Sequence, residues 1–439
     1  MGERALRVLV ASDKFKGTLS AREACGAIAE GARRAAAAWN ERADEAHRSR
    51  QSAGSPCHGT IQIQVDECPL ADGGEGTLDI VSSHVGAVIR NESVAGPDGH
   101  APIRTAWAEW FDESGERCAI IESARVIGLG MVGCDDAGPM ARTSFGLGEL
   151  IGIARNEGCT RIFVALGGTA TVDGGIGCAQ ALGAQFLIGE KWTDDRVGFA
   201  RRFIERFDGT QSRAITAEAL LQLSRVISSA HRPAEGVPPV EVVGLCDVDN
   251  PLLGEHGAAR VFGPQKGATA EQVEALEKGL ENLVRLCEEA KREGVLRGEA
   301  EPDAPGAGAA GGLGFGLRAF LGARLVRGAE YVMDVVRFDE RLAGADVVIT
   351  GEGKLDRQSI GGKVVFGVGK RCWGSEWKPP CLVVVGRVDE PHEELLREFE
   401  RAGAGIVIVE EGGDERGGRE AIVRATERAM TKWLETVKG

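Results

Sequence analysis

The segment from Arg161 to Ala181, RIFVALGGTATVDGGIGCAQA, places three kinds of sequence in direct succession. Ile162–Leu166 is apolar and has the length of a strand, whereas the residues after Gly177 favour a helix. Glycines and threonines fill the interval between them, together with Asp173. The pattern predicts a strand that leads through an open loop into a helix, which is the repeating unit of an α/β fold.

The predicted loop exposes backbone N–H groups. Glycine lets an anion approach them closely, and the start of the following helix adds a partial positive charge. Asp173 would repel a phosphate unless a cation lay between them, so we interpret the loop as a site for a metal-bound phosphate or a polar substrate. The alternative is a tight turn in which Asp173 caps the helix, and this segment alone leaves both open.

The chain has 439 residues, which is long for one hydrophobic core and predicts two domains. Its formal charge of −14 argues against a nucleic-acid partner or an anionic membrane surface, because both need a positive face. No stretch approaches the roughly 18 apolar residues of a membrane span. Eleven cysteines without a CxxC pair, and seven histidines without an HExxH pattern, indicate neither a zinc site nor a disulfide framework. Reduced thiols of this kind predict a cytoplasmic protein.

Strand-like and helix-like segments alternate along most of the chain. Predicted strands are Leu6–Ala11, Ile61–Glu67, Ile162–Leu166, Val240–Leu245, Asp346–Thr350, Leu382–Val385 and Gly405–Val409, and Ile422–Val437 is a predicted amphipathic helix. Such alternation predicts a parallel, doubly wound sheet. Turn signals within Val85–Ala124 predict antiparallel hairpins instead, and hence a second domain inserted into the first. Gly294–Pro305 is the predicted return linker.

Six predicted loops share one design, in which a strand end is followed by glycines, at least one charged residue and a helix start. They begin near Asp13, Asp72, Thr169, Asp247, Gln265 and Gly351. Ligands of open α/β sheets bind beyond the carboxyl ends of the strands, so we expect these loops to form one cleft for a polar ligand.

Four other segments carry less information. Asn40–His58 and Gly189–Pro239 are polar, and we interpret them as surface insertions. Gly128–Gly133 matches GxGxxG by letter but lacks the acidic residue, about 20 positions later, that a dinucleotide site needs. Gly306–Gly316 has no GK[ST] ending, so ligand contact and close helix packing both remain open there.

The acids and lysines of the six loops suit phosphoryl transfer, whose catalysis is mostly positioning and charge neutralisation. Two like charges about 4 Å apart repel by roughly 4 kcal/mol at an effective dielectric near 20. A helix terminus returns only about 0.3–2 kcal/mol, so a phosphate that meets an anionic substrate needs lysines and a metal ion. The chain contains no Walker GxxxxGK[ST] pattern, no kinase HRD or DFG set and no GxSxG elbow.

The loops carry DKFKGTLSA from Asp13, CPLADGGEGT from Cys68, LGGTATVDGGIG from Leu166, DVDNPL from Asp247, GPQKG from Gly263 and TGEGKLDRQSIGGK from Thr350. In this order, from about Val8 to Val409, they resemble the type I glycerate kinase family. Val172 departs from that family, which more often has asparagine before the aspartate, and the polar segments at 40–58 and 189–239 look longer than its core.

The resemblance implies an enzyme that uses ATP and Mg²⁺ to phosphorylate D-glycerate, most often on the 2-hydroxyl to give 2-phosphoglycerate. It also implies an α/β fold in which two α/β domains surround a cleft. One is a discontinuous Rossmann-like parallel-sheet domain of residues 1–72 and 300–439, and the other is an inserted α/β domain of residues 73–299.

The residue patterns and the resemblance together assign candidate roles, each against a structural or capping alternative. Lys14 and Asp173 are the predicted catalytic residues: Lys14 would neutralise substrate charge, and Asp173 would act as general base or metal ligand. Predicted substrate or phosphate contacts are Asp13, Lys16, Asp72, Gly73, Gly74, Glu75, Gly168, Thr169, Lys266 and Lys363. The predicted metal ligands are Asp247 and Glu352.

Other functions compete with this prediction. A non-catalytic sensor of phosphorylated metabolites could use the same loops, and a glycerate kinase could act on the 3-hydroxyl. An oxidoreductase would rest on the isolated GxGxxG match alone. The expected partners are D-glycerate and ATP, without nucleic acid or membrane, and the expected state is a monomer or a homodimer.

Overall fold

The computed structural model describes residues 5–49, 60–133, 138–189, 214–228, 240–296, 298–355, 363–388, 392–406, 408–411 and 418–438. The chain divides into two compact units: the first unit is Met1–Asp72 with Ala329–Gly439, and the second unit is Gly73–Gly328. Residues 294–305, the predicted return linker, lie inside the second unit, and the chain returns to the first unit only after Gly328.

The first unit is built on a five-stranded sheet in the order β13-β12-β11-β1-β2, in which every neighbouring pair is parallel. Its strands are β1 (Leu6–Val10), β2 (Ile63–Glu67), β11 (Val347–Leu355), β12 (Cys381–Val388) and β13 (Ile408–Glu411). The prediction of a parallel α/β sheet is confirmed. Strand β1 lies between β2 and β11, and its last three residues, Val8–Val10, are buried and apolar on both faces of the sheet.

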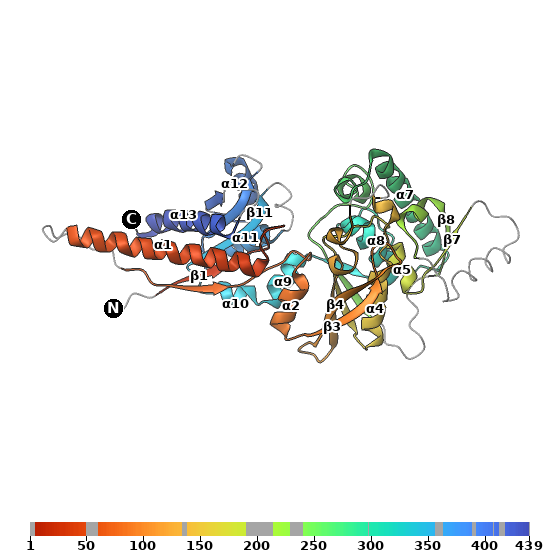
Figure 1. The fold of residues 1–439 in the computed structure, drawn as a ribbon, viewed down its shortest axis with the longest axis horizontal. Helices are drawn as coiled ribbons and strands as arrows, with labels where there is room; N and C mark the ends of the chain where they lie inside the picture. The colour runs from red at the N-terminus through yellow and green to blue at the C-terminus, as the bar shows by residue number, and fades with distance from the viewer. Residues whose placement is uncertain are drawn as a thin grey trace. The chain divides into compact units, whose positions relative to one another are not determined.

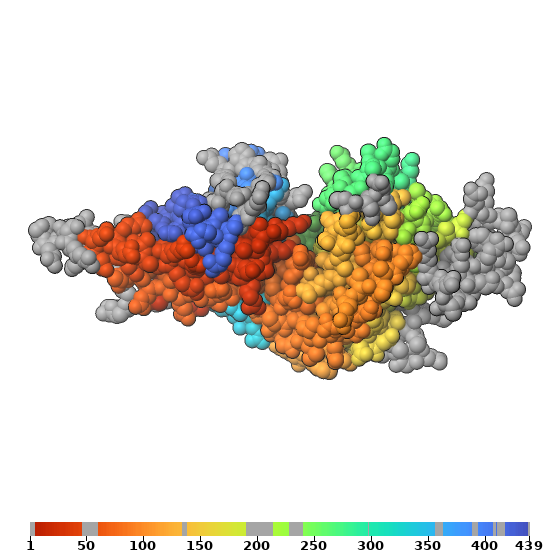
Figure 2. Space-filling view, in the orientation of Figure 1, coloured from red at the N-terminus to blue at the C-terminus, as the bar shows by residue number. Residues whose placement is uncertain are grey.

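The helices of the first unit are α1 (Ala21–Ser49), α9 (Gly328–Val335), α10 (Phe338–Leu342), α11 (Val364–Gly374), α12 (His392–Arg401) and α13 (Arg419–Lys438). Helices α1 and α13 lie side by side (Figures 1 and 2) and bury their apolar faces with β1, β11 and β12. A capping box starts α1: the Ser20 N–H donates to Glu23 Oε2 at 2.9 Å, and the Glu23 N–H donates to Ser20 Oγ at 3.3 Å.

The expected surface insertion at 40–58 is wrong for its first ten residues, because α1 continues to Ser49. Alanine, glutamate and arginine give this segment a high helix propensity. Trp39 packs against the core, and Ala43 is buried. Residues 50–58 lie outside the described residues, as do 190–213 and 229–239 of the second predicted insertion.

The second unit contains a six-stranded sheet in the order β10-β9-β6-β5-β4-β3. Its strands are β3 (Val88–Ala95), β4 (Pro102–Phe111), β5 (Arg117–Glu122), β6 (Arg161–Ala165), β9 (Glu241–Leu245) and β10 (Arg324–Val326). Strands β5, β6, β9 and β10 are parallel, while β3, β4 and β5 form the predicted antiparallel hairpins. A separate antiparallel pair joins β7 (Gln185–Ile188) to β8 (Leu223–Ser228).

Helices of the second unit are α2 (Thr77–Val85), α3 (Ala124–Ile127), α4 (Phe145–Asn156), α5 (Ile176–Ala181), α7 (Ala270–Arg292) and α8 (Ala309–Leu321). Short turns add η1 (Leu129–Met131), η2 (Gly138–Ala141), η3 (Ala217–Gln222), η4 (Ala258–Phe262) and η5 (Pro264–Lys266). In the Gly306–Gly316 segment, close packing is what the structure records. A Cβ on Gly311 would lie 2.7 Å from Val172 Cα, and one on Gly312 would lie 3.0 Å from Gly174 Cα.

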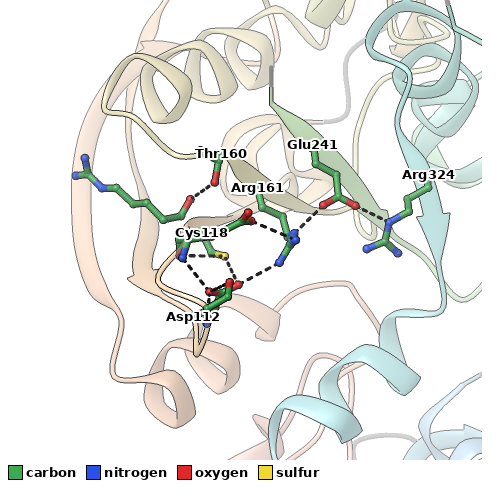
Figure 3. Close-up of polar contacts among 9 residues, drawn as sticks. Asp112, Cys118, Thr160, Arg161, Glu241 and Arg324 are labelled. Carbon is green, nitrogen blue, oxygen red and sulfur yellow. Dashed lines mark hydrogen bonds and ion pairs between the residues drawn. The ribbon is translucent and has the colours of Figure 1, made fainter. Parts of the chain in front are cut away.

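An ion-pair network ties together the amino ends of the parallel strands in the second unit (Figure 3). The Arg161 guanidinium contacts Asp112 at 3.1 Å, Glu116 at 3.2 Å and Glu241 at 2.7 Å. Glu241 also pairs with Arg324 at 2.8 Å. The candidate loops begin at the carboxyl ends of the strands. The network therefore stabilises the opposite edge of the sheet.

Helix α1 contains two glycines with different surroundings. A Cβ on Gly31 would lie 2.6 Å from Thr426 Cβ on α13, whereas a Cβ on Gly26 would meet only Glu67 Oε2, at 3.9 Å. We expect Gly31→Ala to lower the free energy of unfolding by about 1–3 kcal/mol, because the added methyl group would overpack the contact between the two helices. Gly26→Ala should raise it by up to about 1 kcal/mol through helix propensity. Urea unfolding of both variants measures the two signs, and a stabilised Gly31→Ala would contradict the close packing of α1 on α13.

Candidate functional site

Hydrogen bonds join the carboxyl ends of two strands in the first unit, β1 and β11. The Ala11 N–H donates to Ile349 O at 2.8 Å, and the Asp13 N–H donates to Gly351 O at 3.3 Å. The Ser12 hydroxyl donates to the same Gly351 oxygen at 3.0 Å. The residues that follow β1 are thus held against β11, which places the first predicted loop at a rigid edge.

At this edge lies a group of charged residues that we call the Asp13 cluster: Asp13, Lys14, Asp72, Glu352 and Lys363. Lys14 Nζ lies 3.4 Å from Asp72 Oδ1 and 3.9 Å from Asp13 Oδ1. The Lys14 N–H also donates to Asp13 Oδ1 at 2.7 Å. Lys363 Nζ lies 3.6 Å from Glu352 Oε2. The structure therefore brings together five predicted site residues from three separate loops.

Glu352 differs from its prediction in one respect. It belongs to β11, where it pairs with Val385 of β12, and not to a loop. The strand extends five residues beyond the apolar run that predicts it, because its backbone groups continue to pair with β12 as far as Leu355. Residues 356–362 of this predicted loop lie outside the described residues. Lys16 is exposed, next to the positive-φ turn at Gly17, and lies outside the Asp13 cluster.

The pKa of Asp13 is strongly perturbed. Burial raises its pKa to about 7, and the negative charges of Asp72 and, less strongly, Glu352 act in the same direction. The Lys14 ammonium and the Lys14 N–H oppose the rise. Asp13 is 9% exposed, so its carboxyl group can change protonation near neutral pH while remaining almost enclosed.

In the second unit, β6, its glycine-rich loop and α5 follow the predicted strand–loop–helix pattern. Asp173 is completely buried and accepts four hydrogen bonds. The Ser144 N–H and Ser144 hydroxyl each donate to Oδ2 at 2.7 Å, and the Gly177 N–H donates to it at 3.3 Å. The Gly175 N–H donates to Oδ1 at 3.1 Å.

These contacts are the ones expected if Asp173 caps helix α5, which is the structural alternative to a catalytic role. Burial raises its pKa, while the four donors lower it and partly offset that cost. Ser144, which no sequence pattern singled out, completes the arrangement because its Oγ also accepts from the Cys178 N–H at 2.8 Å. Thr143-Ser144 before α4 has the form of a helix cap, yet the Ser144 hydroxyl serves the start of α5 instead. The catalytic role of Asp173 stays a prediction.

Lys266 lies beside the same loop. Its Nζ donates to Thr171 O at 2.7 Å and to Thr169 Oγ1 at 3.1 Å. Burial lowers the pKa of Lys266 to about 7, against the opposing effect of the Asp173 charge. Gly168, with φ of 78°, provides the left-handed turn that sets Thr169 toward this lysine.

The loop that begins at Asp72 approaches the β6 loop very closely. A Cβ on Gly167 would lie 2.6 Å from Gly74 Cα, and a Cβ on Gly73 would lie 2.8 Å from Leu245 O. Gly73 and Gly167 are therefore required by packing, whereas Glu75 is exposed.

The cap of α2 comes from Glu122, which sequence patterns did not indicate because it ends strand β5 far from α2 in the chain. The Gly76 N–H donates to Glu122 Oε2 at 3.1 Å, and the Leu78 N–H donates to it at 3.2 Å. A charged partner supports this buried carboxylate, since Arg125 Nε lies 3.6 Å from Oε1.

Asp247, a predicted metal ligand, is half-buried after β9, and its carbonyl accepts from Arg327 Nη1 at 3.1 Å. Arg327 also forms an ion pair with Asp249. Among the described residues, no three histidine, cysteine, aspartate or glutamate side chains form a group that could hold a metal ion. The metal roles of Asp247 and Glu352 stay predictions.

The family model described as "Glycerate kinase family" matches residues 8–416. The chain belongs to this family. Glycerate kinase from Halalkalibacterium halodurans is 33% identical to it over 389 residues, which cover 89% of this chain and 87% of that protein. Glycerate 2-kinase from Escherichia coli strain K12 is 34% identical over 385 residues, which cover 88% and 86%.

A solved structure supports the family assignment. The crystal structure of a glycerate kinase 2 from Salmonella typhimurium LT2 matches with a TM-score of 0.65 and 29% sequence identity, and the match covers 99% of each chain. Glycerate kinases are enzymes that transfer a phosphoryl group, so this member of the family is a kinase. In the described part of the chain, no helix combines the length and apolar character needed to cross a membrane.

Replacing Asp173 with asparagine separates a capping role from a catalytic one. An amide NH₂ in place of one oxygen would face a backbone N–H, so we expect Asp173→Asn to lower the free energy of unfolding by about 1–3 kcal/mol. Urea unfolding measures the loss, with Glu281→Gln on the exposed face of α7 as the control. Unchanged stability together with abolished turnover would instead support the catalytic role.

The raised pKa of Asp13 predicts a pH-dependent stability. Its pKa of about 7 in the folded protein exceeds the ordinary value of 3.8, so the unfolded chain releases a proton that the folded protein keeps. Stability is therefore lost as the pH rises from about 4 to about 7. We expect Asp13→Asn to remove this loss, so that its gain in Tm over the parent grows between about pH 5 and about pH 8.

This experiment is run without divalent cations, and the exposed Glu376→Gln provides the matched loss of one negative charge in the first unit. A Tm difference between Asp13→Asn and the parent that stays constant across this pH range would contradict a raised pKa at Asp13.

Proposed function

We propose that this kinase transfers the γ-phosphoryl group of ATP to the 2-hydroxyl of D-glycerate and releases 2-phosphoglycerate and ADP. Its family membership supports glycerate as the substrate, and the relative named glycerate 2-kinase favours the 2-hydroxyl. The Asp13 cluster carries the proposal, because a lysine held between two carboxylates at a strand edge suits the binding of opposed anions.

Lys14 supplies positive charge where an anionic substrate and a phosphate would meet. Like charges about 4 Å apart repel by roughly 4 kcal/mol at an effective dielectric near 20, and a cation placed between them offsets this repulsion. The position of Lys14 between Asp13 and Asp72 holds its ammonium group at the strand edge, so the side chain needs little rearrangement to act.

Asp13 is suited to accept the proton of the substrate hydroxyl. A general base works best when its pKa lies near the working pH, and the pKa of about 7 meets that condition. In this proposal Asp13 takes the role of base that the sequence pattern suggests for Asp173, because Asp173 is occupied by four hydrogen-bond donors.

The residues of the Asp13 cluster also suit Mg²⁺. This ion prefers carboxylate oxygens and is usually held by one or two of them together with substrate phosphates and water. Asp72 and Glu352 could hold it in the first unit, and Asp247 is a further candidate. Bound Mg²⁺ would neutralise the phosphate charge that the lysines leave uncompensated.

Two further properties belong to this proposal. All nine described cysteines are buried free thiols, which supports a cytoplasmic location. The net negative charge of the chain and its substrate class favour small-molecule partners. The proposed oligomeric state is a monomer or a homodimer.

Turnover with D-glycerate and ATP tests the proposal. We expect Mg²⁺-dependent ADP release in a coupled assay, and ³¹P NMR should identify 2-phosphoglycerate as the product. Lys14→Met should lower kcat/KM at least about 100-fold, equivalent to roughly 2.7 kcal/mol of transition-state stabilisation. Lys370→Met, at an exposed position of α11, provides the control for loss of a lysine.

Near-normal turnover by a folded Lys14→Met variant would remove Lys14 from the mechanism. Binding of D-glycerate and ATP without any turnover would favour the sensor, and 3-phosphoglycerate as the product would overturn the regiochemistry.

A further inference from the structure

The surroundings of Lys266 contain an imbalance of charge. The residue is 9% exposed, and its Nζ contacts only uncharged acceptors, Thr171 O and Thr169 Oγ1. No aspartate or glutamate among the described residues lies within ion-pair distance of it. A buried ammonium group without a paired carboxylate is costly, so its environment favours either loss of the proton or arrival of an anion.

The hydrogen-bond inventory of Nζ leads to the same conclusion. A neutral amine has two N–H groups, which match the two acceptors in the structure. An ammonium group has three N–H donors, and the described residues supply no third acceptor. The protein therefore supplies an acceptor for each N–H group of neutral Lys266, while the ammonium form needs one further acceptor.

Charged groups near Lys266 do not change this balance. Asp173 is the one charge that shifts its titration, and that carboxylate is committed to its four donors at the start of α5. Arg260 on the neighbouring η4 is paired with Glu274 of α7 at 2.6 Å. Burial lowers the pKa of Lys266 to about 7, which agrees with the count of donors and acceptors.

A second polar group without a partner belongs to the loop that contacts the lysine. Thr171 is fully buried, and its hydroxyl oxygen forms no hydrogen bond with any described residue, although its carbonyl accepts from Lys266. Buried hydroxyls usually have a partner, so this one also indicates that something is added when the site is in use.

We infer that Lys266, with Thr169 and Thr171, forms an oxyanion site that takes up a proton when a carboxylate or phosphoryl group binds. This inference rests on the proposed function for the choice of ligand, since both D-glycerate and ATP carry such a group. It goes further in assigning a proton to the binding step. The incoming oxygen supplies the third acceptor and the missing negative charge together, so binding and protonation stabilise each other.

Isothermal titration calorimetry of the full chain measures the proton directly. D-Glycerate and ADP are titrated separately at about pH 8 in HEPES and in Tris, whose different ionisation enthalpies reveal the protons taken up. For a group with a pKa of about 7, roughly nine tenths of a proton is expected at pH 8 and about one tenth at pH 6. The ligand that shows this uptake is the one whose oxyanion contacts Lys266.

Variants separate Lys266 from other groups that titrate near neutral pH, Asp13 among them. Lys266→Arg keeps a permanent charge, so ligand affinity should remain while the proton uptake disappears. Lys266→Met should lose the uptake and weaken the affinity at least tenfold. Lys278→Met, at an exposed position of α7, should match the parent in both.

A measurement on the parent protein covers the case in which the variants do not fold. With ε-¹³C-labelled lysine, one NMR signal should titrate near pH 7 in the free protein, and the bound ligand should raise that midpoint by about three pH units, as an uptake of roughly nine tenths of a proton at pH 8 requires. Proton uptake that persists in both Lys266 variants, or no lysine titrating near neutrality, would overturn the inference. Proton-coupled binding without turnover would leave it intact and remove the proposed function, whereas turnover without proton uptake would do the reverse.

Discussion

Charge buried at the carboxyl ends of parallel strands is the constraint on which this molecule depends. The sheets leave backbone groups and short loops at these edges, and any ionised side chain held there loses much of its hydration. In the first unit Lys14 lies between two carboxylates, and the pKa of Asp13 still rises to about 7. In the second unit, Asp173 accepts hydrogen bonds from four donors, while Lys266 donates only to uncharged oxygens. An opposite charge compensates the Asp13 carboxylate, and hydrogen-bond dipoles compensate the Asp173 carboxylate. Neither kind of partner fully compensates the charge of Lys266.

These three solutions correspond to different uses. Asp173 is completely satisfied, and such a group specifies a local structure with little freedom to act on a ligand. Asp13 and Lys266 both have pKa values near neutrality, which is where a proton can be gained or lost at little cost. Chemistry in this family member is therefore better sought at the groups whose charge is incompletely compensated than at the best-bonded acid.

Much of the fold could be predicted from the sequence, because periodicity and glycine placement act locally. The strand–loop–helix pattern at Arg161–Ala181, the capping box at Ser20 and the hairpins of β3–β5 all follow from residues close together in the chain. The structure also brings together Asp13, Lys14 and Asp72, which follow the predicted strands, while their functional roles stay predictions. Whether all six loops form one cleft stays a prediction.

What could not be predicted depends on partners distant in the sequence. Glu122 caps a helix that begins more than 40 residues earlier, and Ser144 donates to Asp173 across 29 residues. The strand assignment of Glu352 depends on pairing with β12. No local pattern records these contacts, so sequence alone left Asp173 with two possible roles and missed its main partner.

The central position of β1 has a consequence for biosynthesis. Val8 pairs with Val347 on one side and with Val65 on the other, so one neighbour leaves the ribosome early and the other only when most of the chain has been made. The second unit is complete before that point, because all its residues lie between these partners in the chain. All residues of the inserted unit are therefore translated while β1 still lacks three of the five strands of its sheet. During this interval the nascent chain needs protection from aggregation, since non-local strand pairing is slow and an unpaired apolar strand is a template for association.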